Sequence, residues 1–207
     1  MSQRPGADPR GDPRAGAAAT DSELLARVGH GDRGAFEKLY HRYYRRLYGY
    51  LIRQLLPADL VEEVINDVMY VVWKDAAVFE SRSKVSTWIF GIAYLSARKR
   101  LRRDPREREL PEQEIPLDRI LDPGREIWRH ELRQGLLRAF RGLSPEQRAV
   151  VELTYFQDCS YREIAEIVGC PVNTVKTRMF HARLRLKELL QGLGIHAGSW
   201  QDEGATG

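Results

Sequence analysis

Apolar residues recur at helical intervals along two stretches in the first half of the chain. The first stretch has Phe36, Leu39, Tyr40, Tyr43, Leu47, Tyr50 and Leu51, and the second has Val61, Val64, Ile65, Val68, Val71 and Val72. Residues three or four apart share one face of an α-helix, so each stretch predicts an amphipathic helix. The β-branched residues of the second stretch make a strand the rival, but alternation fails at Val64-Ile65 and at Val71-Val72.

Helix-start signals point the same way elsewhere in the chain. Thr20, Ser144 and Ser160 are each followed three residues later by Glu or Gln, which is the spacing of a capping box. Asp32 can cap a further helix, and Gly169 is placed to end the helix that Ser160 begins. No segment alternates convincingly as a strand, so we expect an all-α fold.

Segments that are poor in core-forming residues divide the chain into two small helical domains. Residues 1–20 are rich in Pro, Gly, Ala, Arg and Asp, and we expect a disordered tail there. Residues 104–127 contain four prolines, eight acidic residues and four arginines, a net charge of −4 that is typical of an acidic linker. The predicted domains therefore span residues 21–103 and 128–191, with a flexible tail over 192–207.

The stretch from Cys170 to Leu190 concentrates positive charge on one helix. Its predicted buried stripe is Val175, Met179, Ala182, Leu186, Leu189 and Leu190. The helix before it ends at a short turn that contains Gly169, which is the pattern of a helix-turn-helix motif. The alternative is a solvated amphipathic helix in a helical hairpin.

The second helix of a helix-turn-helix enters the DNA major groove by its N-terminal residues. Lys and Arg can pair there with guanine or phosphate, Asn with adenine, and Thr with phosphate or a thymine methyl group. The candidates for contact with duplex DNA are Asn173, Thr174, Lys176, Thr177, Arg178, His181 and Arg183.

A second basic segment, "SARKRLRR", ends the N-terminal domain and follows Trp88, Phe90 and Tyr94. Cations beside aromatic rings suit single-stranded nucleic acid, because unpaired bases stack on the rings and phosphates pair with the cations. The alternative is structural, with the aromatic rings in the core and the cations favoured by the helix dipole. The helix that follows Pro57 instead carries Glu62, Glu63 and Asp67, which would repel DNA. Tyr70 and Trp73 lie on the same side and suit a protein partner.

Composition narrows the function classes further. The net charge of +4 is modest, and no apolar run approaches the ~18 residues of a membrane helix, so we expect no membrane insertion. Two cysteines, Cys159 and Cys170, give no disulfide framework and favour a reducing cytoplasm, although a redox switch between them stays open. Five scattered histidines lack metal-ligand spacing, so we expect no catalytic residue, metal or cofactor, and an enzyme is the weakest option.

Four blocks of the sequence, in order, resemble the extracytoplasmic-function (ECF) class of bacterial RNA polymerase sigma factors. "GDRGAFEKLYHRYYRRLY" resembles the start of the family's promoter-melting domain, and "DLVEEVINDVMYVVW" resembles its polymerase-binding helix. "FESRSKVSTWIFGIAYLSARKRLRR" resembles its segment for the −10 element, and residues 143–190 resemble its −35 domain. The resemblance covers about residues 21–191.

The resemblance implies a role for each set of residues. The set that would dock on a basic coiled coil of core RNA polymerase is Asp59, Glu62, Glu63, Asn66 and Asp67. The loop from Phe79 to Thr87 would hold a base flipped out of the melting −10 strand. The implied −10 contacts are Phe79, Ser83, Lys84, Ser86, Thr87, Trp88, Arg98 and Arg102, and the helix-turn-helix candidates would read the −35 duplex.

The function implied in this way is that of a promoter-specificity subunit, not an enzyme. Such a subunit lends core RNA polymerase recognition of promoter DNA and stabilises the melted strands, and we expect an anti-sigma factor to inhibit it. The alternative is an ordinary helix-turn-helix regulator, because residues 144–190 also resemble response-regulator output domains. That alternative requires a strand-rich receiver domain upstream, and the N-terminal half has no such alternation.

Overall fold

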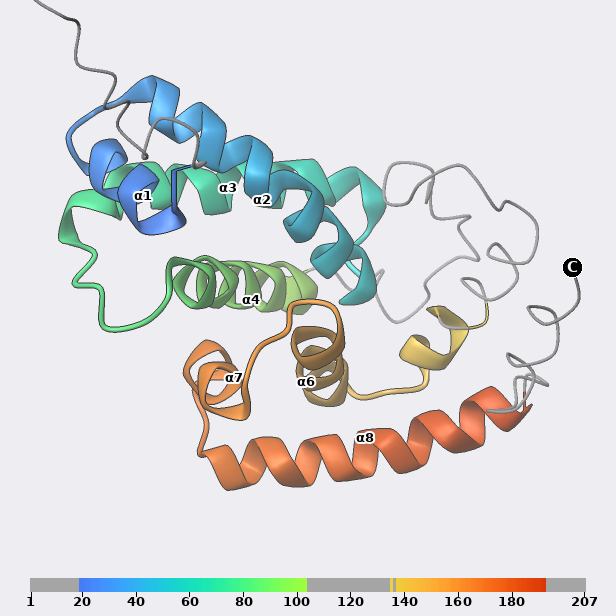
Figure 1. The fold of residues 1–207 in the computed structure, drawn as a ribbon. Helices are drawn as coiled ribbons and strands as arrows, with labels where there is room; N and C mark the ends of the chain where they lie inside the picture. Colours follow the sequence, from blue (N-terminus) through green and yellow to red (C-terminus); the bar gives the residue numbers. More distant parts are fainter. Residues whose placement is uncertain (1–18, 104–134, 136, 193–207) are drawn as a thin grey trace, which may run out of the picture.

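The computed structural model describes residues 19–103, 135 and 137–192. All regular structure within these ranges is helical (Figure 1), which confirms the predicted all-α fold. The linker predicted over 104–127 lies outside the described residues, as do residues 1–18 and 193–207 of the two predicted tails. The helices are α1 (Asp21–Gly29), α2 (Arg33–Arg53), α3 (Ala58–Asp75), the 3-10 turn η1 (Ala76–Val78), α4 (Val85–Arg103), α6 (Pro145–Tyr155), α7 (Tyr161–Val168) and α8 (Val172–Gly192), with further helical residues at 137–141.

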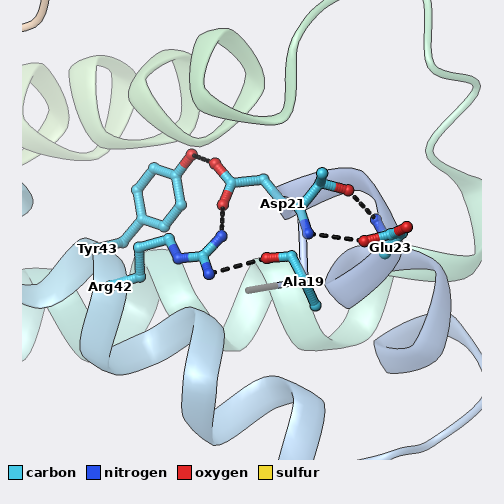
Figure 2. Close-up of polar contacts among 6 residues, drawn as sticks. Ala19, Asp21, Glu23, Arg42 and Tyr43 are labelled. Carbon is cyan, nitrogen blue, oxygen red and sulfur yellow. Dashed lines mark hydrogen bonds and ion pairs between the residues drawn. The ribbon is translucent and has the colours of Figure 1, made fainter. Parts of the chain in front are cut away.

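Helix α1 begins at the predicted capping box and is fixed against α2 by polar contacts. The Thr20 hydroxyl accepts a hydrogen bond from the Glu23 backbone N–H at 3.2 Å, and the Glu23 carboxylate accepts one from the Thr20 backbone N–H at 2.7 Å. The Asp21 carboxylate accepts hydrogen bonds from Arg42 and from the Tyr43 hydroxyl, both at 2.5 Å (Figure 2). These contacts tie the first turn of the described chain to the middle of α2.

Helices α1 to α4 enclose a core with large aromatic side chains. Tyr43, Tyr50 and Phe90 are fully buried, and the Phe90 ring centre lies 5.4 Å from that of Tyr50 and 6.4 Å from that of Tyr43. The predicted stripe of α3 is buried except at Val71, which is half-buried, while Met69 is buried instead. The spacing of the apolar residues therefore predicted the buried face of α3 correctly, except that Met69 takes the place of Val71.

Helices α6 to α8 form a smaller unit, in which α6 and α7 begin at the predicted capping boxes. Ser144 and Ser160 both form capping boxes, with their hydroxyls accepting from the backbone of Gln147 and Glu163. Gly169 caps α7 in the left-handed conformation, with φ of 66°, which favours a residue without Cβ. On α8 the predicted stripe is buried at Val175, Met179 and Ala182 and half-buried at Leu186, Leu189 and Leu190.

The two units are in contact, and α4 is the helix of the N-terminal unit that faces the C-terminal unit. Helix α4 packs against α7, and α2 approaches α6 (Figure 1). Residues 148–153 of α6 are all buried, including Arg148 and Glu152. A helix that is buried on every side needs neighbours all around it, and α7, α8 and the N-terminal unit provide them.

Candidate nucleic-acid interface

The start of α8 presents the residues predicted to contact duplex DNA. Asn173, Lys176, Thr177, His181 and Arg183 are exposed, and Thr174 and Arg178 are half-buried. The opposite side of the helix packs into the core, so the polar side faces solvent. All seven candidates therefore lie on one continuous helical segment, as the sequence predicted.

Few contacts restrain the side chains of this basic face. Arg178 donates to the Cys170 sulfur at 3.6 Å, and Arg183 donates to the Tyr155 hydroxyl at 3.0 Å. Neither partner is a carboxylate, and the first acid along α8 is Glu188, 3.1 Å from Arg185. The cations at the start of α8 therefore keep their charge available to a polyanion.

The loop that precedes α4 and the first turn of α4 hold most of the predicted −10 residues. The Phe79 and Trp88 rings pack with centres 5.0 Å apart, and both side chains are half-buried. Ser83 and Ser86 are also half-buried, and Lys84 is exposed. Thr87 departs from the prediction, because only 3% of it is exposed and its hydroxyl has no hydrogen-bond partner in the described structure. In this structure the Thr87 side chain is therefore shielded from solvent.

Two further −10 candidates lie along α4. Arg98 is half-buried; it donates to the Tyr94 hydroxyl at 3.0 Å, and its guanidinium lies 3.8 Å from Glu146 of α6. Arg102 is exposed near the end of the helix. The −10 set is thus spread along α4, and part of it meets the C-terminal unit.

The Lys84 ammonium also meets an acid of the C-terminal unit. It lies 2.7 Å from the Glu163 carboxylate of α7. The hydrogen bond from Lys84, together with those from Ser160, holds the pKa of Glu163 down to about 2. The carboxylate is therefore ionised at any ordinary pH, and it neutralises a cation of the −10 set.

The five predicted polymerase-binding residues are all exposed on α3. They are Asp59, Glu62, Glu63, Asn66 and Asp67. Two of these acids share a cation that the sequence did not reveal, because Arg100 of α4 pairs with Glu63 and lies 3.4 Å from Asp67. The hydroxyls of Tyr40 and Tyr44 on α2 donate to Asn66 and Glu62 at 3.0 and 3.1 Å.

A mainly apolar groove of about 490 Å³ lies beside this acidic face. It is lined by Arg33, Phe36, Tyr40, Asn66, Met69, Tyr70 and Trp73 of α2 and α3. Tyr70 is 65% exposed at its edge. Aromatic residues beside a charged rim are typical of a protein–protein interface.

Sequence reasoning missed four polar residues that join the two units. Arg53 of α2 pairs with Glu152 of α6 at 2.8 Å, and Arg46 of α2 donates to Gln157 at 3.1 Å. Burial raises the pKa of Glu152, although Arg53 opposes the shift. The available signal was a lone acid in the otherwise uncharged run "AVVELTYFQ".

The described residues offer no other ligand chemistry. They contain no group of three or more His, Cys, Asp or Glu side chains arranged to hold a metal ion. Cys159 and Cys170 are free thiols, and burial raises the pKa of Cys159 to about 11. Among these residues no helix is long and apolar enough to cross a bilayer.

Family models match both units of the chain. The model "Sigma-70 region 2" matches residues 39–107, and the model "Sigma-70, region 4" matches residues 133–186. The first match contains α3 and α4, and the second contains α7 and most of α8, which together form the helix-turn-helix. Together they define a two-part bacterial sigma factor.

Individual relatives specify the class. The chain is 31% identical over 184 residues to the ECF RNA polymerase sigma-E factor of Haemophilus influenzae, covering 84% of this chain and 97% of that protein. It is 34% identical over 166 residues to the ECF RNA polymerase sigma factor RpoE of Cereibacter sphaeroides, covering 77% and 88%. Its fold resembles that of RpoE solved in complex with the anti-sigma factor NepR from Bartonella quintana, with 26% identity, a TM-score of 0.58, and coverage of 75% of this chain and 96% of that one. This chain belongs to the ECF class of RNA polymerase sigma factors, whose members are transcription initiation factors.

Proposed function

We propose that this sigma factor directs core RNA polymerase to promoters by contacting the −35 duplex with α8 and the −10 strand with α4 and the loop before it. The observation that carries the proposal is the start of α8, where exposed polar and cationic side chains stand opposite a buried stripe. A helix-turn-helix of this kind inserts its second helix into the major groove.

The −35 contacts fall into two groups by chemistry. Asn173 and Arg178 have the side chains that form bidentate pairs with adenine and guanine. Lys176, Thr177 and Arg183 suit phosphate oxygens, which fix the register of the helix without selecting a sequence. His181 is exposed about one turn of α8 after Thr177 and would contact the edge of the −35 site.

The −10 strand would meet aromatic rings and cations at the start of α4. Phe79 and Trp88 provide a half-buried aromatic pair on which an unstacked base can pack. Lys84, Arg98 and Arg102 would pair with backbone phosphates. We leave Thr87 out of the proposed contacts because its side chain is buried.

The acidic face of α3 and the neighbouring groove would dock on core RNA polymerase. The exposed carboxylates suit a basic partner, and the aromatic groove between α2 and α3 supplies apolar area beside them. This arrangement keeps the proposed polymerase surface on the side of α4 away from α8 (Figure 1). Action with polymerase also implies a cytoplasmic location.

Inhibition by an anti-sigma protein is part of the same proposal. The support is the likeness to RpoE from Bartonella quintana, which was solved bound to the anti-sigma factor NepR. Affinity purification of the tagged chain from unstressed native cells should recover such an inhibitor. Full sigma activity in those cells, with no inhibitor recovered, would count against it.

Transcription in vitro tests the main proposal. The purified chain is mixed with core polymerase and a genomic library, and start sites are mapped; we expect defined starts that share −35 and −10 sequences. A gel shift with one such promoter separates the alternative, since an ordinary regulator binds its operator without polymerase. Failure to associate with core polymerase at moderate salt would contradict the proposal.

A further inference from the structure

A group of basic side chains on α2 has no part in the proposed −35, −10 or polymerase surfaces. The group consists of Lys38, His41, Arg42 and Arg45, and all four residues are exposed. They are spaced at i, i+3, i+4 and i+7, so they share one face of the helix and extend over about 10 Å along its axis. His41 lies 3.7 Å from Glu37, at the edge of this face. We call the four basic residues the outer α2 face.

The outer α2 face points away from the core of the N-terminal unit. Leu39, Tyr43 and Leu47 lie on the other side of the helix and are fully buried. Helix α2 itself runs along the side of the N-terminal unit that is remote from α8 (Figure 1). The outer α2 face is therefore distinct from the helix-turn-helix and available to a separate partner.

Two cations of the outer α2 face keep their charge available. Arg42 is neutralised by the Asp21 carboxylate at 2.5 Å, and it also donates to the Ala19 carbonyl oxygen at 2.9 Å (Figure 2). Lys38 and Arg45, in contrast, have no acidic partner among the residues that the structure describes. Two uncompensated cations therefore stand two helical turns apart on one exposed face.

The composition of the outer α2 face selects the kind of partner. Protein interfaces are built around an apolar centre, and sites for single-stranded nucleic acid need rings on which bases stack. The large exposed apolar side chains of the described ranges all lie outside α2, so this face provides neither feature. Cations without apolar neighbours instead fit the phosphate oxygens of a regular duplex, which require charge alone.

The distance from the proposed −10 surface agrees with such a partner. Helix α2 packs on α4, and a helix with its side chains is about 10 Å across, so the outer α2 face lies roughly 20 Å from the exposed side of α4. That distance corresponds to about six base pairs of duplex at ~3.4 Å each. Duplex DNA that adjoins a strand held on α4 is therefore within reach of α2.

We propose that the outer α2 face binds the phosphate backbone of the promoter duplex next to the −10 element, without selecting a sequence. Lys38 and Arg45 each pair with one phosphate, and His41 lies between them. This inference rests on the proposed function, because that proposal places the −10 strand on α4. It adds a duplex contact from the N-terminal unit to those of the −10 and −35 sets.

The salt dependence of promoter binding tests the proposal with the full chain bound to core polymerase. The variants are Lys38→Gln, Arg45→Gln and the double variant. Neither side chain has a polar partner within the described ranges, so we expect wild-type folding, which circular dichroism checks. Arg42 is left unchanged because it holds α1 to α2. Lys74→Gln, at an exposed lysine of α3, is the matched control for Lys38→Gln.

Each lost phosphate contact should reduce the slope of log affinity against log salt by about 0.9. The double variant should therefore lose about 1.8 from the slope, and its fall in affinity from about 50 to about 200 mM salt should be roughly tenfold smaller than that of the wild type. We expect the same loss on every promoter and an unchanged slope in Lys74→Gln. Uncharged methylphosphonate linkages in the duplex beside the −10 element should weaken binding by the wild type and leave the double variant unaffected.

A wild-type slope in the double variant would overturn the proposal. Anisotropy of the labelled chain measures association with core polymerase in the absence of DNA. Weaker association of the double variant there would assign the outer α2 face to the polymerase and would likewise overturn the proposal. A wild type that starts no transcripts at defined sites would refute the proposed function, whereas defined starts together with an unchanged slope in the double variant would refute only this inference.

Discussion

The two units of this sigma factor use their charged side chains in opposite ways. At the start of α8 the partners of the predicted DNA-binding cations, within the part of the chain that the structure describes, are neutral: a cysteine sulfur and a tyrosine hydroxyl. In the N-terminal unit Lys84 and Arg98 meet carboxylates of the C-terminal unit, and Arg100 meets those of α3. The comparison indicates that the proposed −35 surface of α8 keeps its positive charge in the free protein. Two cations of the proposed −10 surface, in contrast, are paired with acids of the same chain.

The cores of the two units differ as well. The N-terminal unit buries Tyr43, Tyr50 and Phe90 completely, whereas the C-terminal unit packs Ile164, Val175, Met179 and Ala182. A core with fewer large buried side chains contributes less apolar area, so the C-terminal unit gains more from its contact with α4 and α2. Changes in each unit can show how far the two depend on each other.

The largest expected effect comes from the aromatic core. Phe90→Ala removes a ring that contacts Tyr43 and Tyr50, and we expect it to lower the free energy of unfolding by about 3–5 kcal/mol. Urea denaturation measures the loss, and Leu95→Ala, at a position 66% exposed on the same helix, is the control. Hydrogen exchange should show the loss of protection reaching α7, because α7 packs on α4. Unchanged protection of α7 would mean that the units are energetically independent.

The next effect tests whether the exposed surface of α8 selects a sequence. Arg178→Ala should weaken −35-dependent initiation by about 1–3 kcal/mol if the guanidinium pairs with a base. The measurement is transcription with core polymerase on promoters that vary at −35, with Arg183→Ala as a matched arginine truncation. We expect the second variant to lose activity equally on every promoter, as a phosphate contact does. The same uniform loss in Arg178→Ala would instead assign it to phosphate.

Local signals were enough to predict most of the fold. The capping boxes at Thr20, Ser144 and Ser160 and the turn at Gly169 depend on residues a few positions apart, and all four form as predicted. Helical spacing likewise identified the buried face of α3. The exposure of most −35 candidates followed from the same pattern, because they lie on α8 outside its buried stripe.

Contacts between distant residues could not be predicted in this way. Arg53 and Glu152 are 99 positions apart, and no periodicity relates them. Glu152 would be expected at the surface as an isolated acid, yet the contact between the two units buries it. The burial of Thr87 could not be predicted for a similar reason, since it depends on how α4 packs against its neighbours.

A smaller effect concerns the ion pair that neutralises the −10 surface. In this structure the pKa of Glu163 is about 2, below its ordinary 4.5. The pairing of Glu163 with Lys84 therefore stabilises the contact between the two units above pH 4.5. That stabilisation is lost as the pH falls from about 4.5 toward 2. Because the Lys84 side chain is 73% exposed, solvent screens the ion pair, and we expect it to contribute little to the free energy of unfolding at neutral pH.

A carbon-13 NMR titration of the Glu163 carboxyl carbon measures this coupling directly. Lys84→Met should raise the pKa of Glu163 toward its ordinary value, while Lys74→Met, at an exposed position on α3, should leave it unchanged. An unchanged pKa in Lys84→Met would show that the two units do not meet at this pair in solution.

The smallest expected effect concerns the acidic face of α3. Arg100 links α3 to α4 by pairing with Glu63 and Asp67, so Arg100→Ala should lower the free energy of unfolding by only about 0.5 kcal/mol. The same change removes the cation that neutralises the proposed polymerase surface, and it should therefore speed association with core polymerase at low salt. Stopped-flow association at two salt concentrations measures the effect.

The control variant Lys99→Ala removes the same charge from the adjacent exposed position. An equal change in both variants would indicate a response to net charge alone, whereas a change confined to Arg100→Ala would show that the N-terminal unit also attenuates its own acidic surface.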